Sequence, residues 1–248
     1  MKKYMIKMWD MENRSRCDRR RALASLGAAI LLPASAGAAA RSERLIHRDD
    51  FRRGLGQWIV EAERPGRFEA MDGVLDIDSP AGVTLWFRHR LTSPVAIEYV
   101  VTAVAAGGPN DQVSDINCFW MATDTRSPTG DIRARPRSGA FADYDELRTY
   151  YAGIGGNRNS SSRFRRYVGR MGDRPLLPQH DLSSAADLIE PNRAYRIRLE
   201  AIGGRIALLR DGRTMFRLDD PNPYTAGHFG LRTTASHLRV RDFRVLRL

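Results

Sequence analysis

The stretch Tyr195-Arg-Ile197-Arg-Leu199-Glu-Ala201 alternates apolar and charged residues over its whole length. A period of two is typical of a β-strand with one face buried and the other in solvent. The chain continues with Arg205-Ile-Ala-Leu-Leu-Arg210, then Asp211-Gly212, then Thr214-Met-Phe-Arg-Leu218. An Asp-Gly pair between two strand-like runs predicts a tight β-hairpin. This part of the chain therefore predicts an antiparallel sheet.

Strand patterns of this kind recur along the chain, whereas helical periodicity is nearly absent. Val95–Val104 is rich in β-branched and aromatic residues, and Asp72-Gly73 marks a second hairpin. The apolar positions of the last run shift from Leu238 and Val240 to Phe243 and Val245, which predicts a β-bulge. Further strands are expected at 84–91, 116–123, 150–154, 164–169, 228–233 and 238–248. Short strands without βαβ alternation predict an all-β fold, a two-sheet antiparallel β-sandwich or jelly roll.

The first 40 residues have the pattern of an export signal. Arg19-Arg20-Arg21 precede an apolar run from Ala22 to Pro33, and small residues follow up to Ala40. Consecutive arginines favour the twin-arginine route. The run is shorter than the ~20 apolar residues that a membrane span needs. We therefore expect a cleaved signal at 1–40, a single β-sandwich domain at 41–248, no membrane span after cleavage, and a periplasmic or secreted protein.

Arginine is the dominant charged residue of the expected domain. The whole chain has a formal net charge of +11, and residues 41–248 hold 32 arginines, 26 acidic residues and no lysine. The guanidinium fork binds carboxylate, sulfate or phosphate bidentately, whereas lysine acts as a point charge. A GC-rich genome also favours arginine, so only the clustering of arginines is informative. Cys118 is the single cysteine of this part, which excludes an intramolecular disulfide within it.

One stretch concentrates polar planar side chains around glycines, Tyr150-Tyr-Ala-Gly-Ile-Gly-Gly-Asn-Arg-Asn-Ser-Ser-Ser-Arg-Phe-Arg-Arg-Tyr167. Its spacing does not match a phosphate-binding loop. It predicts a strand, a turn and a second strand that present a surface for an anionic partner. Alternation places Arg163, Arg165 and Tyr167 on one face, and sends Tyr150 and Tyr151 to opposite faces. Which tyrosine faces a ligand stays open, and a solvated basic edge strand is the alternative.

Several framework motifs follow one another along the chain, namely Gly56-Gln-Trp58-Ile-Val60, Asp72-Gly73-Val-Leu75, Leu209-Arg-Asp211-Gly212, Gly227-His-Phe-Gly-Leu-Arg232 and Val240-Arg-Asp242-Phe243-Arg-Val245. In this order they resemble secreted bacterial domains of the concanavalin A-like (lectin/glucanase) jelly-roll class. The resemblance covers roughly Phe51 to Val245, and it extends to a family with a Tyr-Tyr-x-Gly-x-Gly-Gly-Asn pattern. It implies a jelly roll whose concave sheet face holds a glycan.

On that face, the run from Ser114 to Met121 offers a polar pair within a strand. Alternation groups Asp115, Asn117, Phe119 and Met121 on one side, and Ile116, Cys118, Trp120 and Ala122 on the other. Asn117 is a candidate ligand-binding residue, with the alternative that it satisfies a neighbouring backbone group. Trp86 is a candidate sugar platform because it alternates with Leu85 and Phe87.

The chemistry of hydrolysis is not indicated by the sequence. Classical jelly-roll glucanases carry a Glu-x-Asp-x-x-Glu strand motif, which is absent here, and a glycosidase needs two paired carboxylates. The histidines are scattered without the spacing of zinc ligands. No cofactor or metal is expected, although structural calcium stays open. Tyrosine, histidine, arginine and asparagine instead suit β-elimination, as in jelly-roll polysaccharide lyases. Arginine or asparagine would neutralise a uronate carboxylate, while tyrosine or histidine would move protons.

The leading hypothesis is an exported protein that binds and cleaves an acidic, uronic-acid-containing polysaccharide or oligosaccharide by lyase-like β-elimination. The alternative is a non-catalytic carbohydrate-binding module or an envelope-associated glycan-binding protein. Export argues against a nucleic-acid partner, and the oligomeric state is left open. The catalytic candidates are Tyr151, Tyr150 and His237. The substrate-binding candidates are Asn117, Asn157, Asn159, Arg163, Arg165, Tyr167, Arg232 and Trp86.

Overall fold

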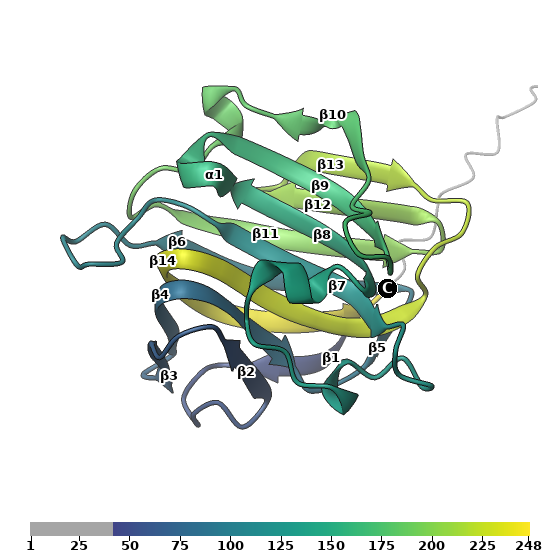
Figure 1. Ribbon diagram of the computed structural model, residues 1–248, viewed down its shortest axis with the longest axis horizontal. Coiled ribbons are helices and arrows are strands. Elements are labelled where there is room, and N and C mark those ends of the chain that lie inside the picture. The colour runs from purple at the N-terminus through teal and green to yellow at the C-terminus, as the bar shows by residue number, and fades with distance from the viewer. Residues whose placement is uncertain (1–41) are drawn as a thin grey trace, which may run out of the picture. The chain divides into compact units, whose positions relative to one another are not determined.

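The computed structural model describes residues 42–248, so the export signal expected at 1–40 lies outside the described residues. The regular secondary structure of the described part is almost entirely antiparallel strands, which form two facing layers (Figure 1). The strands are β1 (Arg44–Asp49), β2 (Trp58–Ala62), β3 (Arg67–Met71), β4 (Val74–Phe87), β5 (Leu91–Thr92), β6 (Val95–Ala103), β7 (Ile116–Asp124), β8 (Leu147–Gly155), β9 (Ser161–Val168), β10 (Leu176–Leu182), β11 (Ala194–Ile202), β12 (Arg205–Arg210), β13 (Arg213–Asp219) and β14 (Ala226–Arg247). The helical turns are η1 (Ile132–Ala134), η2 (Phe141–Tyr144), α1 (Gly156–Asn159) and η3 (Ala185–Asp187). The all-β prediction is confirmed.

Two long strands belong to both layers. The first half of β14 lies between β7 and the second half of β4, and its second half lies beside β6. The register of β14 shifts between Thr234 and Ser236, where Ala235 takes a left-handed φ of 46°. The front layer of Figure 1 therefore runs β10-β9-β8-β7-β14-β4-β2, and the back layer runs β13-β12-β11-β6-β14.

Apolar side chains from both layers meet in one core. The alternation of β6 places Val95, Ile97, Tyr99, Val101 and Ala103 in this core, each no more than 1% exposed. Burying a side chain of this size contributes roughly 1.5–3 kcal/mol. The two Asp-Gly pairs form the expected hairpins, β3–β4 and β12–β13.

The predicted irregularity of the last run is also present. The pairing of β14 with β6 shifts register between Arg241 and Arg244, and Asp242 takes a left-handed φ of 56°. The runs expected at 228–233 and 238–248 are parts of the single strand β14, because the bulge at Ala235 bends the chain between the layers without ending the strand.

The outer face of the front layer carries a second apolar cluster, which we call the outer cluster. The segment 125–144 with η1 and η2 covers it, and Glu61 anchors this segment. Glu61 accepts hydrogen bonds from Trp86 Nε1 (2.8 Å), Tyr144 Oη (3.0 Å) and the backbone of Arg137 (3.0 Å). The segment leaves the rest of the front layer, over β8 and β9, uncovered. The members of the cluster are Trp86, Phe119, Ala122, Ile132, Tyr144, Leu147, Tyr151 and Tyr167.

Candidate functional site

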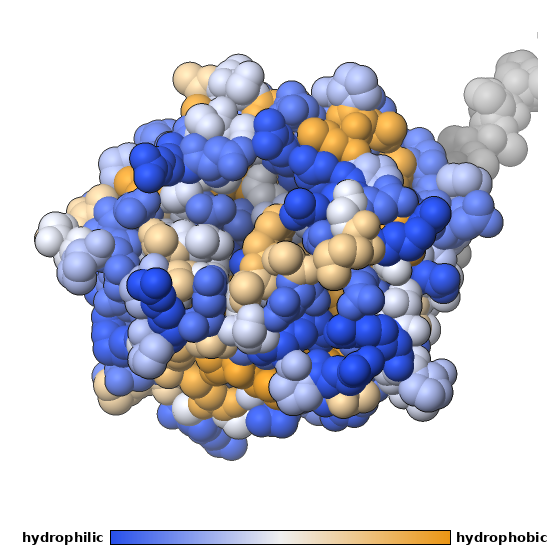
Figure 2. Space-filling view, viewed as in Figure 1, coloured by the Kyte–Doolittle hydropathy of each residue, from blue (hydrophilic) through white to orange (hydrophobic). Residues whose placement is uncertain are grey.

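A cleft of about 610 Å³ lies on the front layer beside the covered part. Figure 2 shows hydrophilic side chains surrounding a hollow on this face of the molecule. Strands β7, β8 and β9, the turn α1 and the bend of β14 line the cleft. Its polar side chains include Asp115, Asn117, Tyr151, Asn157, Arg158, Arg163, Arg165 and Arg174.

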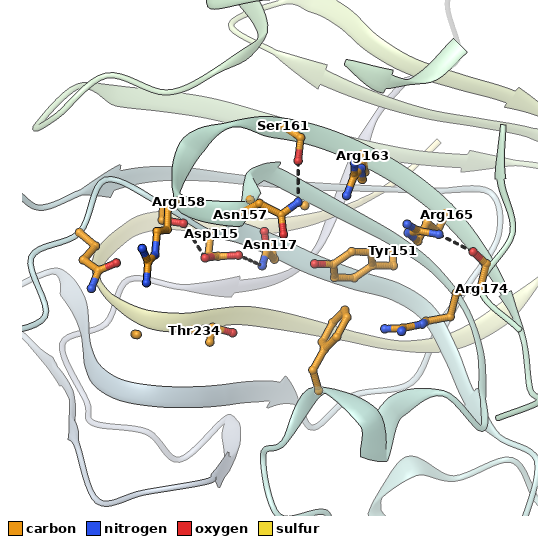
Figure 3. Close-up of a pocket in the computed structure, with 16 residues that line it drawn as sticks. Asp115, Asn117, Tyr151, Asn157, Arg158, Ser161, Arg163, Arg165, Arg174 and Thr234 are labelled. Atoms are coloured by element: carbon orange, nitrogen blue, oxygen red, sulfur yellow. Dashed lines mark hydrogen bonds between the residues drawn. The ribbon is translucent and has the colours of Figure 1, made fainter. Parts of the chain in front are cut away.

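At one end of the cleft, Asp115 holds the amide of Asn117. Asn117 Nδ2 donates to Asp115 Oδ1 at 2.9 Å, and Ser114 Oγ donates to Asp115 Oδ2 at 2.5 Å. Asn117 is 3% exposed, and its Oδ1 has no hydrogen-bond partner among the described residues. The amide therefore presents a buried acceptor to the cleft (Figure 3).

Tyr151 lies along the floor with its hydroxyl toward Asn117 (Figure 3). Its ring packs against Phe119, Phe141 and Tyr167, with ring centroids 5.1, 5.5 and 5.6 Å away. The hydroxyl makes no hydrogen bond with the described part of the chain, although the residue is only 7% exposed. Burial raises the pKa of Tyr151 well above its ordinary value, so the phenol is neutral and can donate a hydrogen bond.

Four arginines line the cleft, and they differ in whether a carboxylate of the protein lies beside them. Arg163 pairs with Asp181 (2.8 Å), and Arg174 lies 3.5 Å from Asp145. Arg165 donates to the backbone oxygen of Arg174 at 2.5 Å. Neither Arg165 nor Arg158 forms an ion pair with any carboxylate in residues 42–248. Asp115 is the only carboxylic acid among the described residues that line the cleft, so positive charge dominates it.

The turn between β8 and β9 has an unusual backbone. Asn157, Arg158 and Asn159 all adopt left-handed φ angles of 54–59°. Such a conformation costs an ordinary L-residue roughly 1–2 kcal/mol, and strained turns cluster at functional sites. Asn157 donates to Ser161 Oγ at 2.9 Å, which holds the turn at the cleft. The strand-turn-strand expected for Tyr150–Tyr167 is confirmed.

The cleft does not include every candidate from the sequence. Tyr150 points into the core between the layers, where its hydroxyl donates to Asp220 (2.7 Å) and accepts from the backbone of Tyr224 (3.1 Å). Its neighbour Tyr151 takes the opposite face, as alternation requires. His237 lies beyond the bend of β14, where it contacts Asp111 (2.7 Å) and Asp76 (3.0 Å), and it does not line the cleft.

Trp86 is completely buried in the outer cluster and therefore offers no exposed platform to a sugar. Tyr167 is buried against Tyr151 in the same cluster. Asn159 exchanges two hydrogen bonds with the backbone of Ile189 and thereby fixes the loop before β11.

Arg232 is 2% exposed beneath the segment 125–144. Its guanidinium lies 4.8 Å from the Phe141 ring centre and 4.9 Å from that of Tyr144. Nη1 donates to Thr84 Oγ1 and to the backbone oxygen of Gly139, both at 3.0 Å. Arg232 is thus under the wall of the cleft rather than in it.

A bulge in β7 corrects the expected side-chain grouping. Asn117 and Phe119 share the front face, and Cys118 and Trp120 lie in the core, as alternation predicts. Met121 then takes a left-handed φ of 55° and enters the core, while Ala122 joins the outer cluster. The extra residue reverses the phase of the strand from that point.

Three polar residues of the cleft were not among the predicted site residues, namely Arg158, Arg174 and Asp115, although the sequence indicates Asp115 as the polar partner of Asn117. Arg158 lies within the glycine-rich stretch, so its position was a usable signal. Arg174 comes from a loop after β9 and has no local pattern. Among the described residues there is no cluster of three or more His, Cys, Asp or Glu that could hold a metal ion, and no helix there has the length and apolar character of a membrane span.

Residues 77–243 match the family described as a domain of unknown function, DUF6250. The chain belongs to this family. All residues that line the cleft, from Gln112 to Ala235, fall within the matched range, so the cleft is a part of the DUF6250 domain. No curated protein matches the chain.

Solved structures with the same fold include proteins associated with carbohydrates. A protein of unknown function with a galectin-like fold from Bacillus subtilis has a TM-score of 0.62 and 17% identity, covering 82% of this chain and 97% of its own. The carbohydrate-binding module CBM66 from Bacillus subtilis has a TM-score of 0.53 and 13% identity, covering 76% and 94%. SCLam, a non-specific endo-β-1,3(4)-glucanase from family GH16, has a TM-score of 0.54 and 11% identity, covering 84% and 96%. At these identities the likeness shows a shared jelly-roll fold and nothing about activity, and it confirms the fold class.

Proposed function

We propose that this protein binds an acidic saccharide in the cleft, with arginine side chains at the sugar carboxylates. The observation that carries the proposal is the pair Arg158 and Arg165, which line the cleft without an ion-pair partner in the described part of the chain. A guanidinium that has no internal carboxylate is available to a ligand carboxylate, and such charge-assisted hydrogen bonds contribute roughly 1.5–3 kcal/mol each.

A saccharide is the favoured ligand class because of the fold and of the floor of the cleft. A carbohydrate-binding module and a glucanase share the jelly roll. Tyr151 and Asn117 supply the ring edge and the amide that sugar recognition commonly uses, beside the arginines. We further propose that the expected signal at 1–40 directs the protein to the periplasm or out of the cell, where acidic glycans occur.

β-Elimination of the bound uronate is a second candidate function. The hydroxyl of Tyr151 and the amide of Asn117, whose Oδ1 has no partner among the described residues, lie in one arginine-lined cleft and favour it. Elimination moves two protons: the C5 proton would pass to Asp115, the one carboxylate among the described residues of the cleft, and the phenol of Tyr151, which burial keeps protonated, would donate to the leaving oxygen. Hydrolysis by paired carboxylates has less support, since Asp115 is the only carboxylic acid among the described residues of the cleft.

Calorimetric titration with oligogalacturonides, alginate oligosaccharides and neutral cello-oligosaccharides tests binding. We expect the acidic ligands to bind, and Arg165→Gln to weaken binding about tenfold, which corresponds to roughly 1.4 kcal/mol. Arg217→Gln, in an exposed arginine of β13 on the back layer, is the matched control and should bind as the wild type does. Equal affinity for neutral and acidic ligands, or no binding at all, would overturn the proposal.

The same ligands test elimination through the ultraviolet absorbance of the unsaturated ends that it creates. Absorbance that rises with the wild-type protein and not with Tyr151→Phe supports a lyase. Binding without any absorbance change supports a non-catalytic carbohydrate-binding protein.

A further inference from the structure

We propose that Asn117 Oδ1, Tyr151 Oη and the bare backbone of Gly153 form a subsite for a free hydroxyl group of the bound saccharide. This proposal rests on the proposed function, because the subsite belongs to the same cleft. The subsite adds a second requirement for ligand recognition to the one that the arginines impose. The arginines select a carboxylate, whereas the subsite selects an unsubstituted hydroxyl near it.

The orientation of Asn117 is determined by its neighbour. Asp115 Oδ1 accepts from the side chain of Asn117, and an ionised carboxylate can only accept. Nδ2 must therefore point to Asp115, and Oδ1 must point away from it. Oδ1 is a buried acceptor without a partner among residues 42–248. A buried acceptor left unpaired costs about 1–3 kcal/mol, so a ligand donor at this position would be strongly favoured.

Tyr151 brings the complementary donor. Its ring is held by the aromatic contacts of the outer cluster, so the hydroxyl has little freedom to move. The hydroxyl points toward Asn117 in the cleft (Figure 3). A neutral phenol donates one hydrogen bond, and the amide oxygen accepts one. A sugar hydroxyl both donates and accepts, so it satisfies both atoms at once.

Gly153 leaves the space that the hydroxyl needs. It lies in the middle of β8, cross-strand from Asn117, without a left-handed backbone that would itself require glycine. A Cβ at Gly153 would lie 2.9 Å from Tyr151 Oη and 3.1 Å from Asn117 Oδ1. Both polar atoms thus face the position that a side chain would occupy. Any larger residue would cover them.

Such a subsite distinguishes sugars by substitution at oxygen. A site built to hydrogen-bond a hydroxyl rejects ligands that lack it, because its own buried polar atoms are then left unpaired. An acetyl ester removes the donor proton and adds bulk beside Gly153. We therefore expect the protein to bind unsubstituted acidic saccharides and to reject those acetylated at the hydroxyls, even though their carboxylates are intact.

The experiment uses calorimetry with three forms of one oligogalacturonide, namely the unmodified, the O-acetylated and the methyl-esterified form. Methyl esterification removes the charge and tests the arginines, whereas O-acetylation preserves the charge and tests the subsite. With wild-type protein, both modifications should weaken binding, each at least about tenfold. Because this comparison needs no variant, it does not depend on the folding of a mutant.

Gly153→Ala should weaken binding of the unmodified ligand about tenfold and leave the circular dichroism spectrum unchanged. Gly56→Ala, in the turn before β2 where a Cβ would meet nothing within 4 Å, is the matched control. Asn117→Leu is the second variant and should lower affinity to a similar extent. If methyl esterification has no effect, the proposed function fails. If esterification weakens binding but O-acetylation, Gly153→Ala and Asn117→Leu do not, the subsite alone is wrong.

Discussion

Two adjacent tyrosines have opposite environments in this protein. Tyr150 is in the core, and its hydroxyl bonds to Asp220 and to the backbone of Tyr224. Tyr151 is on the floor of the cleft and has no hydrogen bond to the described chain. The difference of one position in a strand decides which hydroxyl maintains the fold and which is available to a ligand.

The pair supports a prediction with an internal control. Tyr150→Phe leaves Asp220 and a backbone N–H without one partner each, so we expect the free energy of unfolding to fall by about 1–3 kcal/mol with binding unchanged. Tyr151→Phe removes a hydroxyl that the fold does not use, so stability should stay within about 0.5 kcal/mol of wild type while affinity for the acidic ligand drops. Urea denaturation and calorimetry measure the two effects. The interpretation fails if the two variants lose the same property.

How far the sequence predicts these residues depends on their neighbours. Alternation correctly assigns Tyr150 and Tyr151 to opposite faces, but both faces are apolar clusters with tyrosines, so alternation alone does not identify the cleft. Asn117 is predictable because the polar residue lies within an apolar strand. The environments of Arg232 and His237 are not predictable in this way. That of Arg232 depends on the covering segment 125–144, and that of His237 depends on a loop from elsewhere in the chain.

At the level of elements, the segment 125–144 determines the extent of the cleft. It covers the outer cluster, and the buried ion pair of Arg137 with Asp124 (2.5 Å) holds its middle. The prolines and glycines of this segment are typical of a loop, and its composition does not show that it packs on the sheet. Trp86 is buried because this segment covers it, whereas its ring would be exposed on an open sheet face.

The anchoring role of Glu61 is testable. In Glu61→Ala, three buried donors lose their acceptor, namely Trp86 Nε1, Tyr144 Oη and the backbone of Arg137. We expect the free energy of unfolding to decrease by about 3 kcal/mol. Relative to the wild type, hydrogen exchange in the variant should accelerate more in 125–144 than in β6. Glu69→Ala, on the exposed side of β3, is the control and should change stability by no more than about 0.5 kcal/mol. Uniformly faster exchange across the whole domain would show that Glu61 stabilises more than this segment.

At the level of the molecule, the continuity of β14 and β4 joins the two layers. A strand that pairs in both layers cannot lose its partners in one layer without disturbing the other. The domain is therefore expected to unfold as one cooperative unit. The hydrophobic alternation in the sequence specifies the strands of each layer, but the bend at Ala235 does not follow from it, because the mostly polar run 232–237 interrupts the alternation and indicates a break between two strands rather than one bent strand.

The ionisation of buried tyrosines at high pH can report whether the domain unfolds as one unit. Burial raises the pKa of Tyr167 to about 12 and raises the pKa values of Tyr99, Tyr144, Tyr150 and Tyr151 as well. In the unfolded chain each would ionise near its ordinary value of about 10. The folded state binds these protons more tightly, so the stabilisation is complete below about pH 10 and is lost as the pH rises toward 12.

These tyrosines come from both the core and the outer cluster, so they report on both sides of the front layer. We expect their ultraviolet phenolate signal to appear together with the loss of circular dichroism, in a single transition above about pH 10. Labelling of the thiol of Cys118, which is buried in the core, should begin in the same pH range. Ionisation of the outer-cluster tyrosines well before Cys118 becomes reactive would show instead that the covering segment opens separately from the sandwich.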